Sequence, residues 1–358
     1  MIDPSDMEAG AHNLLVNCAQ IQEGETVLIV HEDPQLGWYD EPVLSAIEEG
    51  VRKLFIEPEI MRVGPPGGGD GERAKRATAD FDCTIFLARI GDQDRFDDPL
   101  PGHRTVMVYA RNGAMLGSDF GKADHRAMLE FKQAINRVTA SAKQIEITCG
   151  LGTNFVGSPE YQELDAPQDV SVQRFPMAVP APVEAKGFSG RVALARYLTP
   201  TGSQVYDPPH LQIEGVVFAE VENGRIAGFS GDRQEVEKIE QHYASVSTQL
   251  GIEPDYVHSW HAGIHPACAY DSDPADNPDR WSNFIFPNPR ILHFHTCGNY
   301  APGEICWMVL DPTIAVDGEV LWKNGRLMTD QFSETKAVLD TWPELKNLFG
   351  QPELRIGV

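Results

Sequence analysis

The stretch 26–30 reads TVLIV, and it is the first of several short apolar runs that decide the fold class. Similar runs follow at 54–56, at 84–88 (TIFLA) and at 105–109 (TVMVY), and residues 41–53 have a helical pattern. Short β-rich runs separated by helices are typical of a parallel sheet with helices on both faces. We therefore predict an α/β domain with a parallel sheet over residues 1–150.

Further signals complete this first domain. Ser5 followed by Glu8 is a capping-box pattern that predicts a helix running to Ala19. Residues 122–142 predict a long amphipathic helix. The glycine-rich stretch 64–69 is interpreted as a surface loop, because no strand is expected directly before it and no GK[ST] follows.

The pattern changes near residue 150. Hairpin signals occur at 222–224 (ENG), 317–318 (DG) and 323–325 (KNG), and residues 235–250 form one helical segment. These features predict a second domain over residues 151–358, of the α+β class and largely antiparallel.

Charge and cysteine content narrow the functional class. The chain has 29 basic and 53 acidic residues, a net charge of -24, and such a field repels nucleic acid and anionic membranes. There is no run of 18 apolar residues and no basic stretch followed by an apolar one at the N-terminus. The six cysteines are scattered and form no CxxC pair. We expect a cytoplasmic protein with reduced cysteines and with no nucleic-acid or membrane partner.

Histidines are concentrated in one part of the second domain. Five of the eleven fall within 38 residues: His258, His261, His265, His293 and His295. If 291–296 is a strand, its side chains alternate, so His293 and His295 face one side and Phe294 the other. Two neutral imidazoles on one face form a bidentate metal clamp. The sequence therefore predicts a metal site here.

Other residues could complete that site. His258 and His261 cannot both point inward from an ideal strand, so at most one or two of His258, His261 and His265 are expected to be ligands. His265, beside Pro266, is expected to be structural, which leaves His258 and His261 as the candidates. Glu304 would complete a two-histidine, one-carboxylate set, which leaves positions open for substrate and dioxygen on Fe(II). Cys306 is an alternative soft ligand, although a buried thiol is the more usual role.

Two residues are candidates for catalysis without binding the metal. Tyr300 could donate a hydrogen bond or a proton to a bound oxygen species. Arg89 follows the strand at 84–88, where an open parallel sheet places ligand-contacting groups, and could meet a substrate anion. Trp260, Phe294 and Trp307 could wall an aromatic ring, although such residues more often belong to a core.

Several stretches resemble, in order, the aminopeptidase T-like metallopeptidases and their relatives, the 2,5-dihydroxypyridine 5,6-dioxygenases. They are 22–30 (QEGETVLIV), 183–190 (VEAKGFSG), 222–224 (ENG), 263–266 (GIHP) and 314–320 (IAVDGEV). The resemblance implies a Rossmann-like N-terminal domain, a C-terminal metal-binding domain and a homo-oligomer.

The chain departs from both groups at their metal ligands. One metal-binding glutamate of the peptidases falls on Met177 and a second near Ser259, and methionine cannot replace a carboxylate bridge. In the dioxygenases the second position is a histidine, which His258 matches with a one-residue slip and for which His261 is the other candidate. The late His-x-Asp pair of the family falls on Glu304 and Cys306.

These observations predict a divergent member with a rearranged single-metal site. The leading hypothesis is a mononuclear non-haem Fe(II) dioxygenase that opens a small hydroxylated aromatic or N-heteroaromatic ring, with a 2,5-dihydroxypyridine-like substrate. One alternative is an aminopeptidase- or amidohydrolase-type enzyme in which Zn(II) or another divalent metal activates water. Another is a non-catalytic relative that binds a metal or ligand.

Overall fold

The structure is a computed structural model that describes residues 3–93, 95–159, 170–177, 179–203 and 205–358. The chain forms two compact units, each built from two stretches. Unit 1 comprises Met1–Leu129 and Ala166–Ala178, and unit 2 comprises Glu130–Asp165 and Val179–Val358. Among the described helices, none has the length and apolar character needed to span a membrane.

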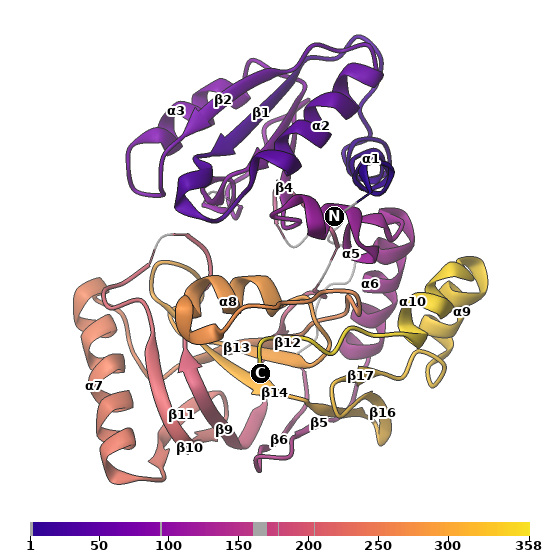
Figure 1. Cartoon of the computed structure of the whole chain (residues 1–358). Coiled ribbons are helices and arrows are strands. Elements are labelled where there is room, and N and C mark those ends of the chain that lie inside the picture. Colours follow the sequence, from indigo (N-terminus) through magenta and orange to yellow (C-terminus); the bar gives the residue numbers. More distant parts are fainter. Residues whose placement is uncertain (1–2, 94, 160–169, 178, 204) are drawn as a thin grey trace. The chain divides into compact units, whose positions relative to one another are not determined.

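Unit 1 contains a five-stranded sheet in the order β2-β1-β3-β4-β7 (Figure 1). All four strand pairs are parallel, which confirms the predicted sheet. Every residue of β1 and β3 is buried, as expected for apolar runs inside a parallel sheet. The strands are β1 (Val27–Glu32), β2 (Glu59–Val63), β3 (Cys83–Leu87), β4 (Arg104–Val108) and β7 (Gln173–Phe175).

The helices of unit 1 lie close to the predicted positions, and the predicted helix at 41–53 is α2 itself. The predicted helix at 122–142 is α6, which begins in unit 1 and ends in unit 2. The helices are α1 (Pro4–His12), continued by the π-helical η1 (Asn13–Cys18), α2 (Glu41–Lys53), α3 (Asp70–Thr78), α4 (Gly113–Gly117), α5 (Asp119–Lys122) and α6 (His125–Ala140), with short 3-10 turns η2 (Pro34–Leu36) and η3 (Arg89–Asp92).

Three local predictions in unit 1 were wrong. The strand expected at 54–56 is a turn, because Phe55 adopts a φ of 62° that an extended strand does not allow. The true strand β2 therefore lies directly before the glycine-rich loop at 64–69. The third wrong prediction is the capping box, in which Ser5 would be the N-cap of the first helix. Helix α1 is instead capped by Asp3, whose side chain accepts from the backbone N–H of Ser5, so Ser5 lies inside the helix.

Unit 2 contains two sheets whose pairs are all antiparallel among the described strands, which confirms the predicted fold class. The eight-stranded sheet has the order β11-β10-β9-β6-β5-β15-β16-β17. Its strands are β5 (Ile145–Thr148), β6 (Asn154–Gly157), β9 (Phe188–Leu198), β10 (Leu211–Glu222), β11 (Arg225–Ser230), β15 (Thr313–Val316), β16 (Glu319–Lys323) and β17 (Arg326–Leu327).

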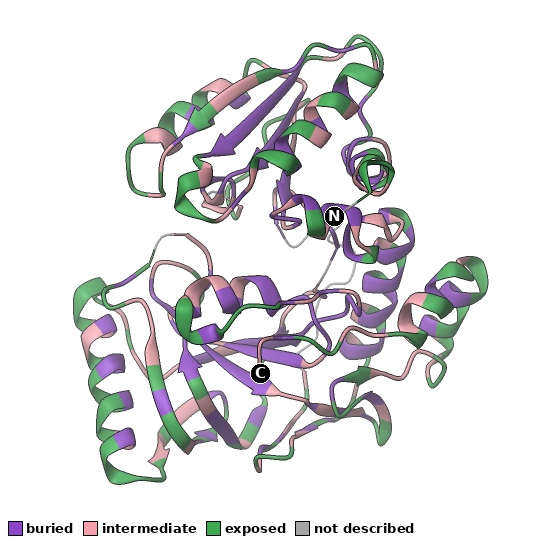
Figure 2. Ribbon diagram, viewed as in Figure 1, coloured by how far each residue is buried: buried purple, intermediate pink, exposed green. Residues whose placement is uncertain are grey.

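The second sheet of unit 2, called here the four-stranded sheet, has the order β14-β13-β12-β8. Its strands are β8 (Val183–Glu184), β12 (Val257–Ala262), β13 (Ile291–Cys297) and β14 (Glu304–Leu310). The helices of unit 2 are α7 (Arg233–Leu250), α8 (Pro278–Ile285), α9 (Ser333–Thr341) and α10 (Glu344–Gly350), with the 3-10 turn η4 (Pro274–Asp276). Figure 2 shows that β12, β13 and β14 are buried along most of their length.

One face of the four-stranded sheet belongs to the hydrophobic core. Trp260, Phe294 and Trp307 are 1%, 0% and 0% exposed. Phe294 meets Phe155 of β6 edge to face at 5.4 Å, and Trp260 meets Phe188 of β9 at 5.8 Å. These aromatic residues therefore join the two sheets, and they are core residues rather than walls of a substrate pocket.

Candidate metal centre

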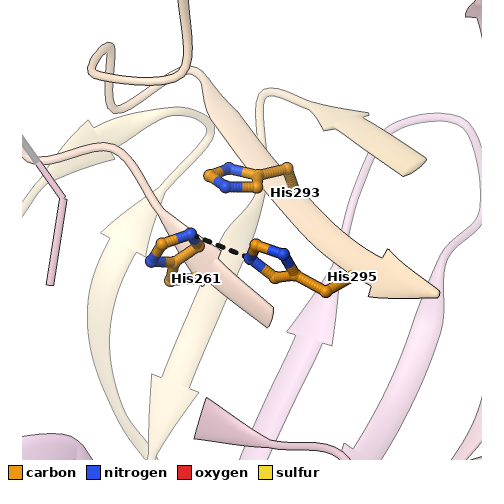
Figure 3. Close-up of side chains that lie close together, drawn as sticks. All are labelled: His261, His293 and His295. Atoms are coloured by element: carbon orange, nitrogen blue, oxygen red, sulfur yellow. Dashed lines mark hydrogen bonds between the residues drawn. The ribbon is translucent and has the colours of Figure 1, made fainter. Parts of the chain in front are cut away.

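The opposite face of the four-stranded sheet carries three histidines. In the antiparallel register, His261 of β12 lies opposite His293 of β13, and Ser259 lies opposite His295. Directly opposed residues in an antiparallel pair place their side chains on the same face, as do residues two apart along one strand. His261, His293 and His295, called here the histidine cluster, therefore converge on one side of the sheet (Figure 3).

The geometry of the histidine cluster suits one cation. A ligand atom from each ring lies within 4.8 Å of the others. The ring centroids are separated by 4.1 Å for His261 and His293, by 5.0 Å for His261 and His295, and by 5.1 Å for His293 and His295. His261 and His293 are 6% and 3% exposed, so a bound ion would be largely shielded from solvent.

Hydrogen bonds hold two of the three rings in a defined orientation. Nδ1 of His261 donates to the carbonyl oxygen of Pro180 at 2.9 Å, and Nδ1 of His295 donates to the carboxylate of Glu304. A carbonyl and an ionised carboxylate can only accept, so the proton of each neutral ring sits on Nδ1. Each Nε2 then presents a lone pair, and an acceptor behind a ligating histidine also raises its basicity.

The two Nε2 atoms of His261 and His295 face each other at 3.1 Å, as the dashed line in Figure 3 shows. Two lone pairs at this distance repel one another unless a shared proton or a cation lies between the rings. Nitrogen ligands about 2.1 Å from a zinc-like ion are about 3.0–3.4 Å apart in octahedral or tetrahedral sites. The donor set therefore fits a divalent transition-metal ion.

Glu304 contacts the histidine cluster through Nδ1 of His295. It is 1% exposed, and its two carboxylate oxygens accept from Nδ1 of His295 and from the hydroxyl of Thr201. The sequence suggested Glu304 as a direct ligand, whereas the structure places its carboxylate on the side of His295 that faces away from the other two rings. Glu304 and Thr201 thus orient His295.

The structure separates the two histidines of β12 that the sequence could not distinguish. The register shifts between Val257 and Ser259, so His258 is the extra residue of a β-bulge. Its Nε2 lies 2.8 Å from the carbonyl oxygen of Cys297, and its ring stacks on Tyr256. His261 joins the cluster and His258 does not.

Other histidine and cysteine candidates have structural surroundings. His265, in the loop after β12, is 0% exposed, and its backbone N–H donates to the carbonyl oxygen of Pro287. Cys306 lies opposite His295 in the register. Burial, together with the nearby Glu304, raises the pKa of the Cys306 thiol well above its usual range, so it stays protonated.

The two candidate catalytic residues belong to different units. Tyr300 is in the connection between β13 and β14, and its side chain is 55% exposed. Arg89 belongs to unit 1, where its Nε donates to the fully buried carboxylate of Glu32 at 2.9 Å and its guanidinium lies over Trp38. The proposed catalytic roles of Tyr300 and Arg89 stay predictions.

Sequence reasoning missed three residues that surround the cluster. Phe286, which follows α8, stacks on the ring of His293 at 4.2 Å. Pro180 and Thr201 provide the hydrogen bonds described above. No local sequence pattern marks these three residues, because each reaches the cluster through tertiary packing. For example, the β-bridge between Thr199 and Cys306 joins segments far apart in the chain and brings Thr201 to Glu304.

Solved structures with the same fold were found. The structure of 2,5-dihydroxypyridine dioxygenase from Pseudomonas putida KT2440 matches with a TM-score of 0.59 and 13% identity, over 94% of this chain and 100% of that one. AmpT, aminopeptidase T, from Thermus thermophilus matches with a TM-score of 0.53 and 12% identity, over 90% of this chain and 99% of that one.

By sequence, no protein-family model matches the chain, and no curated protein matches it. The chain therefore shares its fold, over 90–94% of its length, with one dihydroxypyridine dioxygenase and one AmpT.

Proposed function

We propose that unit 2 binds one divalent cation through His261, His293 and His295, and that the protein is a mononuclear non-haem Fe(II) dioxygenase. The proposed reaction is the opening of a small hydroxylated aromatic or N-heteroaromatic ring, such as a 2,5-dihydroxypyridine, by dioxygen. The observation that carries the proposal is the convergence of three imidazoles, two of them held by Nδ1 hydrogen bonds with Nε2 turned toward the cluster.

A single cation is favoured over a pair. Within the described residues, the histidine cluster is the one group of three or more histidine, cysteine or acidic side chains that lie close enough together to share an ion. It contains no carboxylate. Two-metal hydrolytic centres place their ions about 3.5–4 Å apart and need ligands for both. Imidazole nitrogens suit iron as well as zinc, copper and nickel.

The residues of the chain have separable roles in this proposal. A bound ferrous ion would supply the redox chemistry between dioxygen and a hydroxylated ring. Glu304 accepts the Nδ1 proton of His295 and keeps its Nε2 free to bind, and Thr201 holds Glu304 in place. Phe286 stacks on one side of the His293 ring.

A second function is favoured by one specific observation. The cluster consists of imidazoles alone, and three histidines are a ligand set of catalytic zinc, which leaves a fourth position for water. A hydrolase that uses Zn(II)-activated water is therefore the alternative.

Anaerobic reconstitution tests these functions. We expect the metal-stripped chain to bind one equivalent of Fe(II) and then to consume dioxygen with 2,5-dihydroxypyridine or a catechol. Cleavage of peptides or amides with Zn(II) or Co(II), and no oxygen uptake, would favour the hydrolase. Tight metal binding without any turnover would indicate a binding protein. Elemental analysis of the purified protein identifies the native metal.

His258→Ala is the matched control for the cluster, since His258 lies on the same strand but bonds to Cys297. It should retain metal binding and activity.

Tyr300 is proposed as a proton donor, so Tyr300→Phe should lower turnover without lowering metal content. The homo-oligomer implied by the family resemblance is tested by light scattering.

A further inference from the structure

Unit 2 contains a cavity of about 580 Å³ that the proposed function does not use. It is lined by residues of β9 and β10, by the turn between β5 and β6, and by the end of β14. None of its described lining residues belongs to the histidine cluster. Small-molecule sites in proteins typically have volumes of about 300–1,000 Å³, so this cavity can hold a ligand of its own.

The rim of the cavity is open to solvent, whereas its walls are apolar and buried. Arg196, Gln212 and Leu151 line it and are exposed. Tyr197 and Ile213 also line it and are only 7% and 4% exposed. A small molecule can therefore enter from solvent and reach an apolar interior.

A β-bulge between two neighbouring strands shapes the cavity. Strands β9 and β10 pair side by side (Figure 1), and their register shifts between Ile213 and Val216. Arg196, which lies opposite Ile213, has a φ of 67°. Bulges bend a strand and redirect its side chains, and strained non-glycine backbone of this kind is found most often at functional sites. Successive residues of a strand normally face opposite sides, yet Arg196 and Tyr197 both line the cavity.

The charge that lines the cavity is positive. Among the described residues, none forms a side-chain hydrogen bond or ion pair with the guanidinium of Arg196. The other charged lining residue is Asp311, whose carboxylate accepts from Nε and Nη2 of Arg290 at 2.6 and 2.8 Å. Glu214, in the bulge, does not line the cavity. Salt screens exposed charges beyond about 8 Å, so Arg196 dominates the field inside the cavity despite the acidic excess of the whole chain.

We propose that this cavity is a second ligand site of unit 2, which binds a small carboxylate with an apolar body. The guanidinium of Arg196 would form the paired hydrogen bonds that arginine makes with a carboxylate. The apolar walls would cover the hydrocarbon part of the ligand. The inference does not depend on the proposed function, because none of the residues that carry it binds or orients the metal.

Calorimetry on the full chain tests the site with benzoate as the probe. Benzamide has nearly the same shape without the charge, and acetate has the charge without the apolar body. We expect benzoate to bind at least about tenfold more tightly than either, and more weakly as the salt concentration rises. The affinity for benzoate should be the same in His293→Ala, which removes a proposed metal ligand.

Variants of the two parts of the site locate the probe. Arg196→Gln should weaken benzoate binding by about tenfold or more, and Arg196→Lys, which keeps the charge without the planar fork, by about threefold. Leu151→Ser, in the exposed turn before β6, should weaken it by about 3- to 10-fold. Arg233→Gln is the matched control, because it removes the same charge from an exposed arginine at the start of α7 and should change nothing.

Four results would each overturn the site. They are no binding of benzoate, equal binding of benzamide, equal losses in Arg196→Gln and Arg233→Gln, and loss of benzoate binding in His293→Ala, which would place the probe at the metal centre. A loss confined to the Arg196 and Leu151 variants supports the cavity, whether or not the Fe(II) form consumes dioxygen.

Discussion

The two faces of the four-stranded sheet are built from alternate residues of the same strands, yet they have different surroundings. On one face, His293 and His295 meet His261 across the strand pair. On the other, Phe294 packs against Phe155 of the eight-stranded sheet. A one-residue slip of a strand would exchange its two faces, so the buried aromatic face fixes the register on which the histidine cluster depends.

The largest expected effect falls on the aromatic face. Phe294→Ala should lower the free energy of unfolding by about 3–5 kcal/mol, because it leaves a cavity where a fully buried ring joins two sheets. Urea denaturation followed by fluorescence measures the loss. At low temperature the folded fraction should still bind one metal ion, and a folded variant that binds none would contradict the separation of the two faces.

Substitutions on the histidine face should show the opposite pattern. His293→Ala and His295→Ala should each abolish activity and weaken metal binding by more than about 100-fold, while the fold stays intact. Metal titration and circular dichroism measure the two properties separately. Full activity in either variant would remove that residue from the site, and His258→Ala supplies the baseline.

A smaller loss of metal affinity is expected for residues that contact a proposed ligand through hydrogen bonds rather than binding the metal themselves. Glu304→Gln keeps an acceptor for Nδ1 of His295 but removes its charge, so metal affinity should fall by about 10- to 100-fold. Thr201→Val, which removes the hydroxyl that donates to Glu304, should cost less, about 3- to 10-fold. Competition with a chromophoric chelator measures both, and a larger loss in Thr201→Val would reverse the proposed order of contacts.

The smallest expected change in activity is for a substitution that tests how this chain differs from the peptidases. Met177→Glu restores a carboxylate where the resemblance places a peptidase ligand, but it should create no aminopeptidase activity, because the other ligands also differ. Hydrolysis of aminoacyl p-nitroanilides with Co(II) or Zn(II) is the measurement. Since Met177 is buried, some loss of stability is expected as well. Clear peptidase turnover would show that one residue separates the two activities.

Local pattern predicted much of the fold. The residues of α2 form the predicted helix end to end, and β1, β3 and β4 lie within one or two residues of the apolar runs. The strand expected at 54–56 failed because the chain turns at Phe55, whose backbone has a positive φ. A run of three apolar residues does not reveal such a turn.

The sequence by itself determined which side chains of a strand share a face, because alternation is a property of the extended backbone; His293 and His295 followed from that rule. Only the tertiary structure decided that His261 is their partner, that a bulge diverts His258, and that Glu304 lies behind His295. These choices depend on the register between strands far apart in the chain. That register is set by the packing of whole sheets rather than by any local stretch of residues.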